Sequence, residues 1–202
     1  MTETTAISLA AGLSRRMGAQ NKLLLAVDGV PMIRHVTQQY QAAIDGPILV
    51  VLGHEAHLVE EALDSPGVDT VFNADFAAGQ FTSVAAGLRN AADAQTLMIG
   101  LGDQPLLSST DILALLTAHY CADRDKISFP VHQGNRGNPL VVPRSLRARL
   151  LEEPKNPGCQ KFTRANADLV QELPLPTPGL FIDIDTPEAY QTHCLPMKEA
   201  AA

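Results

Sequence analysis

The chain has 202 residues, of which 46% are hydrophobic and 18% charged, and its formal net charge at pH 7 is −7. This is the composition of a folded globular protein rather than a disordered one. The negative charge disfavours binding to nucleic acid or to an anionic membrane, and no apolar run of about 18 residues predicts a membrane span. The length favours one domain over residues 1–202, with residues 198–202 frayed.

Cysteine spacing and the N-terminal sequence bear on the compartment. Cys121, Cys159 and Cys194 are widely separated, so they predict neither a disulfide framework nor a Cys-x-x-Cys metal site. The first residues include Glu3 and lack the basic stretch of a signal peptide. We therefore expect a cytoplasmic protein.

Apolar runs alternate with helical patterns from the N-terminus to about residue 120. The unbroken run Ile48–Leu52 is typical of a strand buried on both faces. The last helix of this part has Ser109 or Thr110 available as its cap. Strands are predicted at residues 5–9, 48–52, 69–72 and 96–101, and helices at residues 31–43, 55–63, 83–92 and 111–120. Such βα repeats predict parallel strands with helices on both faces of the sheet.

The order of elements changes from Lys126 onwards. Strands at residues 127–131 and 140–142 flank a polar, glycine-rich loop at residues 133–139. A helix near residues 158–165 and a final strand at 180–184 are expected to follow. The predicted fold class is α/β, a single three-layer α/β/α domain with a mixed, mainly parallel sheet.

A turn of small and basic residues follows the first strand. Ligands of open α/β sheets bind outside the carboxyl ends of the strands. Small side chains let the backbone amides approach a ligand, while a hydroxyl and two cations can bind phosphate oxygens. The residues concerned are Ala10, Ala11, Gly12, Ser14, Arg16 and Lys22. The pattern suits a nucleotide triphosphate, although it matches neither GxxxxGK[ST] nor GxGxxG, and a solvated turn is the alternative.

Carboxylates follow two of the predicted strands or lie within them. Asp103, in Gly-Asp-Gln-Pro, comes directly after the strand at 96–101 and could hold a divalent metal that bridges phosphates. Asp183 and Asp185 are two residues apart, so in a strand they would share one face. The alternatives are a turn role for Asp103 and a helix cap for Asp185, since Thr186-Pro-Glu follows.

Polar residues also follow the strand at 69–72. Asn73 would end this strand, and Gly79 and Ser83 would open a helix whose N-terminus faces the substrate. Asn73 or Ser83 could then contact a ribose or a base edge. An ordinary loop with a helix cap is the alternative.

These motifs come in the order L-A-A-G-x-S-x-R-M-G with a later Lys, N…G…TS…GL, G-D-Q-P, G-x-x-G-N-P and D-I-D-T-P-E. From residue 7 to 190 the chain is similar to the molybdopterin nucleotidyltransferases, most of all to those that use cytidine. The resemblance implies a Rossmann-like nucleotidyltransferase domain that depends on Mg²⁺. It implies transfer of CMP from CTP to the terminal phosphate of molybdopterin, with release of pyrophosphate.

The resemblance also assigns roles to individual residues. The backbone of residues 10–12 would contact the nucleotide, with Arg16 and Lys22 on its phosphates. Asn73 and Ser83 would lie near the nucleoside. Asp103 would hold Mg²⁺ with help from Asp183 or Asp185, and residues 134–139, including Gly137, Asn138 and Pro139, would lie on the pterin side.

Two positions bear on the choice of substrates. Relatives often carry His where this chain has Asn138, and Asn cannot supply a cationic imidazole. Ala11 gives Ala-Ala-Gly, which in the family accompanies cytidine, whereas Ala-Gly-Gly accompanies guanine. A molybdoenzyme or its maturation chaperone would receive the product. A guanylyltransferase, a nucleotidyltransferase acting on a sugar or polyol phosphate, and a non-catalytic molybdenum cofactor carrier remain alternatives.

Overall fold

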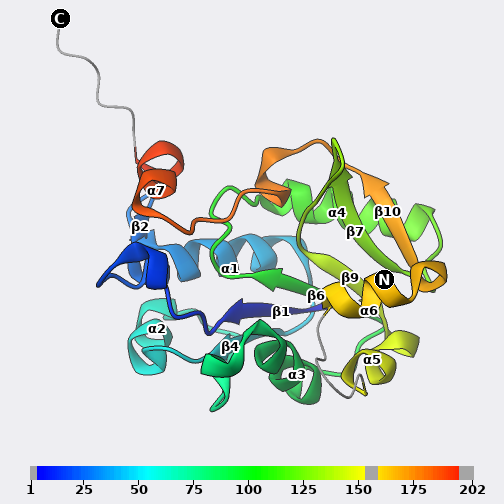
Figure 1. Ribbon diagram of the computed structural model, residues 1–202, viewed down its shortest axis with the longest axis horizontal. Coiled ribbons are helices and arrows are strands. Elements are labelled where there is room, and N and C mark those ends of the chain that lie inside the picture. Colours follow the sequence, from blue (N-terminus) through cyan, green and yellow to red (C-terminus); the bar gives the residue numbers. More distant parts are fainter. Residues whose placement is uncertain (1–3, 153–158, 196–202) are drawn as a thin grey trace, which may run out of the picture.

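The computed structural model describes residues 4–152 and 159–195, which form a mixed sheet with helices on both sides (Figure 1). The strand order is β10-β7-β9-β6-β1-β4-β5, with β8 beside β7. β9 is antiparallel to both neighbours, β8 is antiparallel to β7, and the other adjacent pairs are parallel. The strands are β1 (Thr4–Ala10), β4 (Ile48–Leu52), β5 (Val68–Phe72), β6 (Thr96–Leu101), β7 (Ile127–His132), β8 (Asn135–Arg136), β9 (Leu140–Pro143) and β10 (Val170–Pro174). A separate two-stranded ribbon pairs β2 (Ala26–Val27) with β3 (Val30–Pro31).

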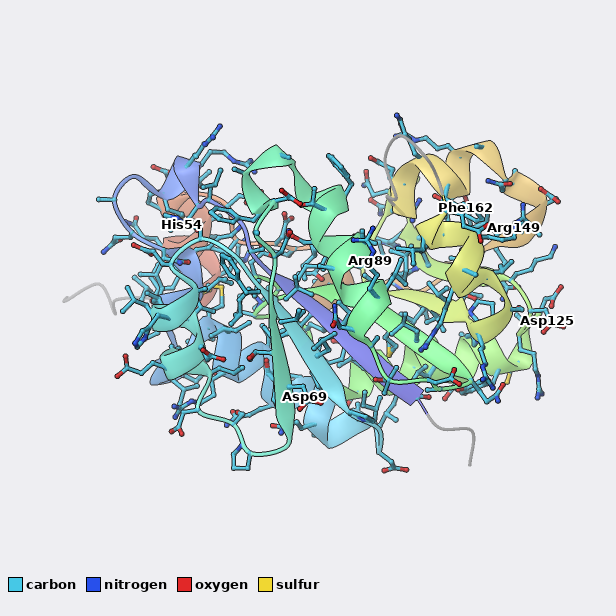
Figure 2. All side chains as sticks on the ribbon, turned by 90° about the horizontal axis from the view of Figure 1, so that it is seen from below. His54, Asp69, Arg89, Asp125, Arg149 and Phe162 are labelled. Carbon is cyan, nitrogen blue, oxygen red and sulfur yellow. The ribbon has the colours of Figure 1, made fainter. Side chains whose placement is uncertain are left out.

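Two hydrophobic clusters attach the helices to the sheet. One cluster contains the buried side chains of α1 (Met32–Ala43), α2 (Ala56–Leu63) and α4 (Ser109–Cys121). The other contains those of α3 (Gln80–Asn90), α5 (Arg144–Leu151) and α6 (Cys159–Ala165). In the second layer the Arg149 guanidinium lies 5.8 Å from the centre of the Phe162 ring (Figure 2). The predicted three-layer α/β/α fold is therefore confirmed.

The remaining helical segments are short. α7 (Pro187–Cys194) lies beside the ribbon, where the Tyr190 hydroxyl donates a 2.5 Å hydrogen bond to the Ala26 carbonyl. The 3₁₀ turns are η1 (Arg15–Met17), η2 (Lys22–Leu24), η3 (Phe76–Ala78), η4 (Ala167–Leu169) and η5 (Pro178–Leu180). No described helix is both long and apolar enough to pass through a membrane. The predicted fraying of residues 198–202 concerns a stretch outside the described residues.

The central strands β1, β4 and β6 match the sequence prediction because nearly all of their residues are buried. All five residues of β4 are buried, and β4 pairs with β1 in the register Ser8 to Val50. β1 thus lies between β6 and β4, and its C-terminal end lies beside the end of β6. This adjacency brings the loop after β1 close to the loop after β6.

Two predictions about local structure were wrong, and one predicted helix begins three residues earlier than expected. Residues 180–184 form no strand, because their backbone groups bond to loops: the Ile184 amide donates to the Asp103 carbonyl at 2.9 Å. The cap of α4 is Ser108, which forms a capping box with Asp111, so neither Ser109 nor Thr110 is the cap. The helix predicted at 83–92 begins at Gln80, directly after Gly79 with its φ of 128°.

Candidate active site

A cavity of about 440 Å³ lies at the carboxyl ends of β1 and β6. The loop after β1, the start of α3 and the segment before α7 form its walls. The predicted site residues in its lining are Ala10, Ala11, Gly12, Ser14, Arg16, Lys22, Gly79, Ser83, Asp103, Asp183 and Asp185. Segments more than 150 residues apart in the sequence thus contribute to one cavity. Phe76, Ala77 and Gln80 also line it, and sequence reasoning assigned them no role.

The loop after β1 changes from closely packed to open within three residues. Ala10 and Ala11 are 2% and 5% exposed, and a side chain at Gly53 would collide with Ala11. At Gly12 a Cβ atom would meet no atom within 4 Å among the described residues. A ligand can therefore approach the backbone at Gly12 from the cavity side.

Ser14 shapes this loop from within. It adopts a left-handed conformation with φ 49°, and its hydroxyl accepts a 3.3 Å hydrogen bond from the Lys22 amide. The same hydroxyl donates to the Asn21 side chain at 3.4 Å. Both contacts tie the two ends of the loop together and direct Lys22 toward the cavity.

A cluster of opposite charges lies at the base of the cavity. The Lys22 ammonium forms ion pairs with Asp103 and, at 2.7 Å, with Asp185. The Arg16 guanidinium binds the other oxygen of Asp185 at 2.6 Å. The side chain of Lys22 is only 10% exposed, whereas that of Arg16 is 67% exposed. The Lys22 contacts are therefore the better shielded from solvent.

Burial and charge shift the pKa values of this cluster in opposite directions. Burial raises the pKa of Asp103, and Lys22 offsets only part of that effect. Burial and the charge of Asp185 raise the pKa of Asp183. Burial also opposes ionisation of Lys22, but Asp103 and then Asp185 outweigh it, so the pKa of Lys22 is raised. Burial likewise opposes ionisation of Asp185, but Lys22 and then Arg16 outweigh it, so the pKa of Asp185 is lowered. The carboxylates thus need cations nearby to stay ionised.

The three carboxylates fit a hard divalent cation. One oxygen from each of Asp103, Asp183 and Asp185 lies within 4.8 Å of the others. Oδ1 of Asp103 is buried and has no hydrogen-bond partner among the described residues. Mg²⁺ and Mn²⁺ prefer such oxygen ligands. Thr186, whose side chain accepts from the Ala189 amide, caps α7, so the alternative role of Asp185 as the cap is excluded.

Asn73 lies behind the cavity wall. Its side-chain amide donates hydrogen bonds to the hydroxyls of Thr82 at 2.8 Å and Ser83 at 3.0 Å. Its carbonyl oxygen accepts from the Asp75 amide at 3.0 Å. Asn73 is 5% exposed, and its contacts hold the start of α3, including Ser83, against the cavity. A role next to the nucleoside therefore stays a prediction for Asn73, with Ser83 as its link to the cavity.

A second cavity, of about 530 Å³, adjoins the first. The two share Leu9, Gln80 and Leu101 in their linings. The second is otherwise lined by Phe81, Val84, Ile99, Arg136, Gly137, Asn138, Leu140, Gln160 and Lys161. Of residues 134–139, which were predicted on the pterin side, Arg136, Gly137 and Asn138 line this cavity, while Pro139 follows Asn138 through a cis peptide bond.

The wall of the second cavity is tied to the segment that carries the carboxylates. The backbone amide of Asn138 donates a 2.8 Å hydrogen bond to the backbone carbonyl of Leu180. A side chain at Gly137 would collide with that carbonyl and with the Phe181 ring. Arg136 lies over the Phe129 ring, 4.0 Å from its centre, and donates to the Thr163 hydroxyl at 2.5 Å. Arg136 belongs to the 134–139 stretch predicted on the pterin side, whereas sequence reasoning assigned no role to Gln160 or Lys161, because only the tertiary fold places these two beside Gly137.

Residues 6–170 match the family described as the MobA-like NTP transferase domain. The chain belongs to this family. It is a nucleotidyltransferase, and the matched residues include the loop after β1 and Asp103. The resemblance to nucleotidyltransferases is thus confirmed at the level of the family.

Individual relatives of the MobA-like domain differ in length and name. Nicotine blue oxidoreductase of Paenarthrobacter nicotinovorans is 26% identical over 91% of this chain and 93% of its own length. The bifunctional protein GlmU of Campylobacter curvus is 34% identical over 58% of this chain, which spans only 27% of that relative. A manganese complex of Rv0371c from Mycobacterium tuberculosis has the same fold: TM-score 0.76, 21% identity, and coverage of 95% of this chain and 97% of that one.

Proposed function

We propose that this chain folds as one nucleotidyltransferase domain and transfers CMP from CTP to the terminal phosphate of molybdopterin, giving molybdopterin cytosine dinucleotide and pyrophosphate. The observation that carries the proposal is the cluster of Lys22 and Arg16 with three carboxylates, set in a cavity that opens into a second one. The first cavity would hold the nucleotide and the second the acceptor. A molybdoenzyme or its maturation chaperone would receive the product.

The chain's residues would act by positioning and by neutralising charge. The triphosphate would lie along the backbone of residues 10–12, where Gly12 is open to the cavity. Lys22 and Arg16 would offset the charge on the α-phosphate and on the departing pyrophosphate. Ser83 and the amides at the start of α3 would face the nucleoside.

The acceptor needs no general base. A phosphate monoester has a second pKa near 6, so it is largely dianionic at neutral pH. One of its oxygens would attack the α-phosphorus, and the bond from that phosphorus to the bridging oxygen of pyrophosphate would break. The main barrier is the approach of two polyanions, which positioned cations lower.

Asp103, Asp183 and Asp185 would hold the Mg²⁺ that the family implies. When bound, this ion supplies positive charge to the phosphate oxygens of the nucleotide. The raised pKa of Asp103, caused by burial, indicates a carboxylate that gains from a cation. The manganese complex of Rv0371c supports a divalent cation in this fold.

A second acceptor class has support from one residue. Asn138, in the wall of the second cavity, carries a neutral amide that can donate to and accept from hydroxyl groups. A sugar or polyol phosphate would match that chemistry. The preference for CTP over GTP rests on Ala11, which lines the first cavity.

Pyrophosphate release tests the proposal. Purified protein would be incubated with Mg²⁺, each nucleoside triphosphate in turn, and either molybdenum-loaded molybdopterin or a panel of sugar and polyol phosphates. We expect release with CTP and molybdopterin, and mass spectrometry should then find the cytosine dinucleotide. Release with GTP would correct the base, and release only with a sugar phosphate would correct the acceptor. Tight cofactor binding without release under any condition would contradict transfer and favour a carrier.

A further inference from the structure

The cations that would bind the triphosphate lie on the carboxylates that would bind the metal. Lys22 contacts Asp103 and Asp185, and Arg16 contacts Asp185. Three carboxylate oxygens in the cluster thus have a cationic partner within the protein itself. We propose, on the basis of the proposed function, that Lys22 and Arg16 act as a latch: they hold these carboxylates until a triphosphate draws them away, so that the metal binds together with the nucleotide.

Charge explains why the metal alone would bind weakly. The cluster has three carboxylates and two cations, so its formal charge is −1. A divalent cation among these oxygens would lie close to the Lys22 ammonium, which is held in the same place and only 10% exposed. Repulsion between cations in a poorly solvated site is strong, because water screens it little.

A triphosphate would reverse this balance. It brings several negative charges into the cavity that Lys22 and Arg16 both line. The Lys22 backbone is fixed by its amide hydrogen bond to Ser14, but its four-carbon side chain can swing the ammonium from carboxylate to phosphate. Each ligand would then favour the other, and thermodynamic reciprocity requires the same coupling factor in both directions.

Lys22 should dominate the latch. Its ammonium contacts two of the three carboxylates and is well shielded, whereas Arg16 contacts one and is 67% exposed. Exposed ion pairs contribute little because solvent and salt screen them. Arg15 provides a matched control, because it lines the same cavity from the same loop but forms no ion pair with a described residue.

The experiment measures Mn²⁺ binding to the 202-residue chain in the absence of nucleotide, by electron paramagnetic resonance of the unbound ion. We expect Lys22→Met to bind Mn²⁺ about tenfold more tightly than wild type, within the range usual for coupled sites. Arg16→Gln should bind it about twofold more tightly, as suits an exposed pair, and Arg15→Gln should match wild type. Mn²⁺ alone should raise the melting temperature of Lys22→Met but not that of wild type.

Equal Mn²⁺ affinities of folded wild type and folded Lys22→Met would overturn the latch. If Lys22→Met does not fold, the comparison is made between wild type and Arg16→Gln, since Arg16 is exposed. Equal Mn²⁺ affinities of these two proteins in the absence of nucleotide would then contradict the latch. Pyrophosphate release by the same wild-type sample separates the two proposals. Pyrophosphate release combined with equal Mn²⁺ affinities of wild type and variant would support the proposed function and reject the latch. Unequal Mn²⁺ affinities without nucleotide transfer to any acceptor would support the latch and reject the proposed function.

Discussion

The two adjoining cavities differ in how the chain builds them. The first lies at the ends of parallel strands β1 and β6, and charged side chains in mutual contact form its base. The second lies against β9, the antiparallel strand inserted between β6 and β7, and is lined by apolar residues with polar side chains from α6 and the 136–138 loop. The first cavity therefore presents a cluster of paired charges, whereas the second presents an apolar wall with a few polar side chains.

The largest effect should come from the first cavity. Asp103→Asn keeps the shape of the side chain but removes the carboxylate that contacts Lys22 and would hold the metal. We expect kcat for pyrophosphate release to fall roughly 10²–10³-fold, the range for loss of one electrostatic group in an active site. Asp93→Asn is the control, because Asp93 is exposed and pairs with Arg144 at the surface. A kcat within twofold of wild type for Asp103→Asn would remove this residue from the reaction centre.

The base preference is the next test, because it asks whether the first cavity also selects the nucleotide base. Ala11→Gly removes one methyl group from the cavity lining at a position that is 5% exposed. A change of one methyl group in a pocket is worth roughly 10-fold to 200-fold in discrimination, so we expect the ratio of kcat/KM for CTP over GTP to fall by about tenfold, the lower end of that range. Unchanged selectivity, with circular dichroism showing a folded variant, would place base recognition elsewhere.

A smaller effect should appear in the second cavity alone. Lys161 is an exposed residue of α6 that lines this cavity, so Lys161→Gln should raise KM for the acceptor while KM for CTP stays constant. An exposed cation contributes about 1 kcal/mol or less, which corresponds to a rise of about fivefold or less. Arg164→Gln, on the same helix but outside the cavity lining, should leave both constants unchanged. A shift in KM for CTP instead would contradict the division between the cavities.

The same contrast explains what could be predicted from sequence. The first cavity was predictable because Gly12 and Asp103 directly follow apolar strands, and parallel strands end at one edge of the sheet. The second was predicted only in part: the family resemblance pointed to residues 134–139, but Gln80 and Lys161 join this cavity only through packing of α3 and α6 on the same layer. No local pattern in the sequence indicates that contact.

Two errors in the fold have related causes. Residues 180–184 are apolar except for Asp183, as in a buried strand, yet their backbone bonds to the loops that form the two cavities. β10 (Val170–Pro174) was missed because it lies at the edge of the sheet and is only partly buried, so its sequence lacks a clear apolar run. In both segments the backbone conformation is therefore determined by tertiary contacts and not by the local sequence pattern.

The smallest effect concerns the part of the sheet that supports the second cavity. His119 on α4 is 1% exposed and bonds to the Ser128 hydroxyl of β7 at 2.7 Å. Burial lowers its pKa, and Arg124 adds to this, while Asp123 opposes it. The unfolded chain has the ordinary value near 6.5, so as pH falls through about 6.5 the unfolded state gains a proton that the folded state does not.

As the pH is lowered below about 6.5, the free energy of unfolding should therefore decrease, until the pH reaches the lowered pKa of His119 in the folded protein. Removing this residue should flatten that dependence: between pH 7 and 5.5, His119→Gln should lose about 1 kcal/mol less unfolding free energy than wild type, measured by urea titration. His57→Gln, on the exposed face of α2, should follow wild type. His119 lines neither cavity, so the kinetic constants of His119→Gln at pH 7 should equal those of wild type. A change in KM for the acceptor alone would instead show that the packing of α4 on β7 influences the second cavity.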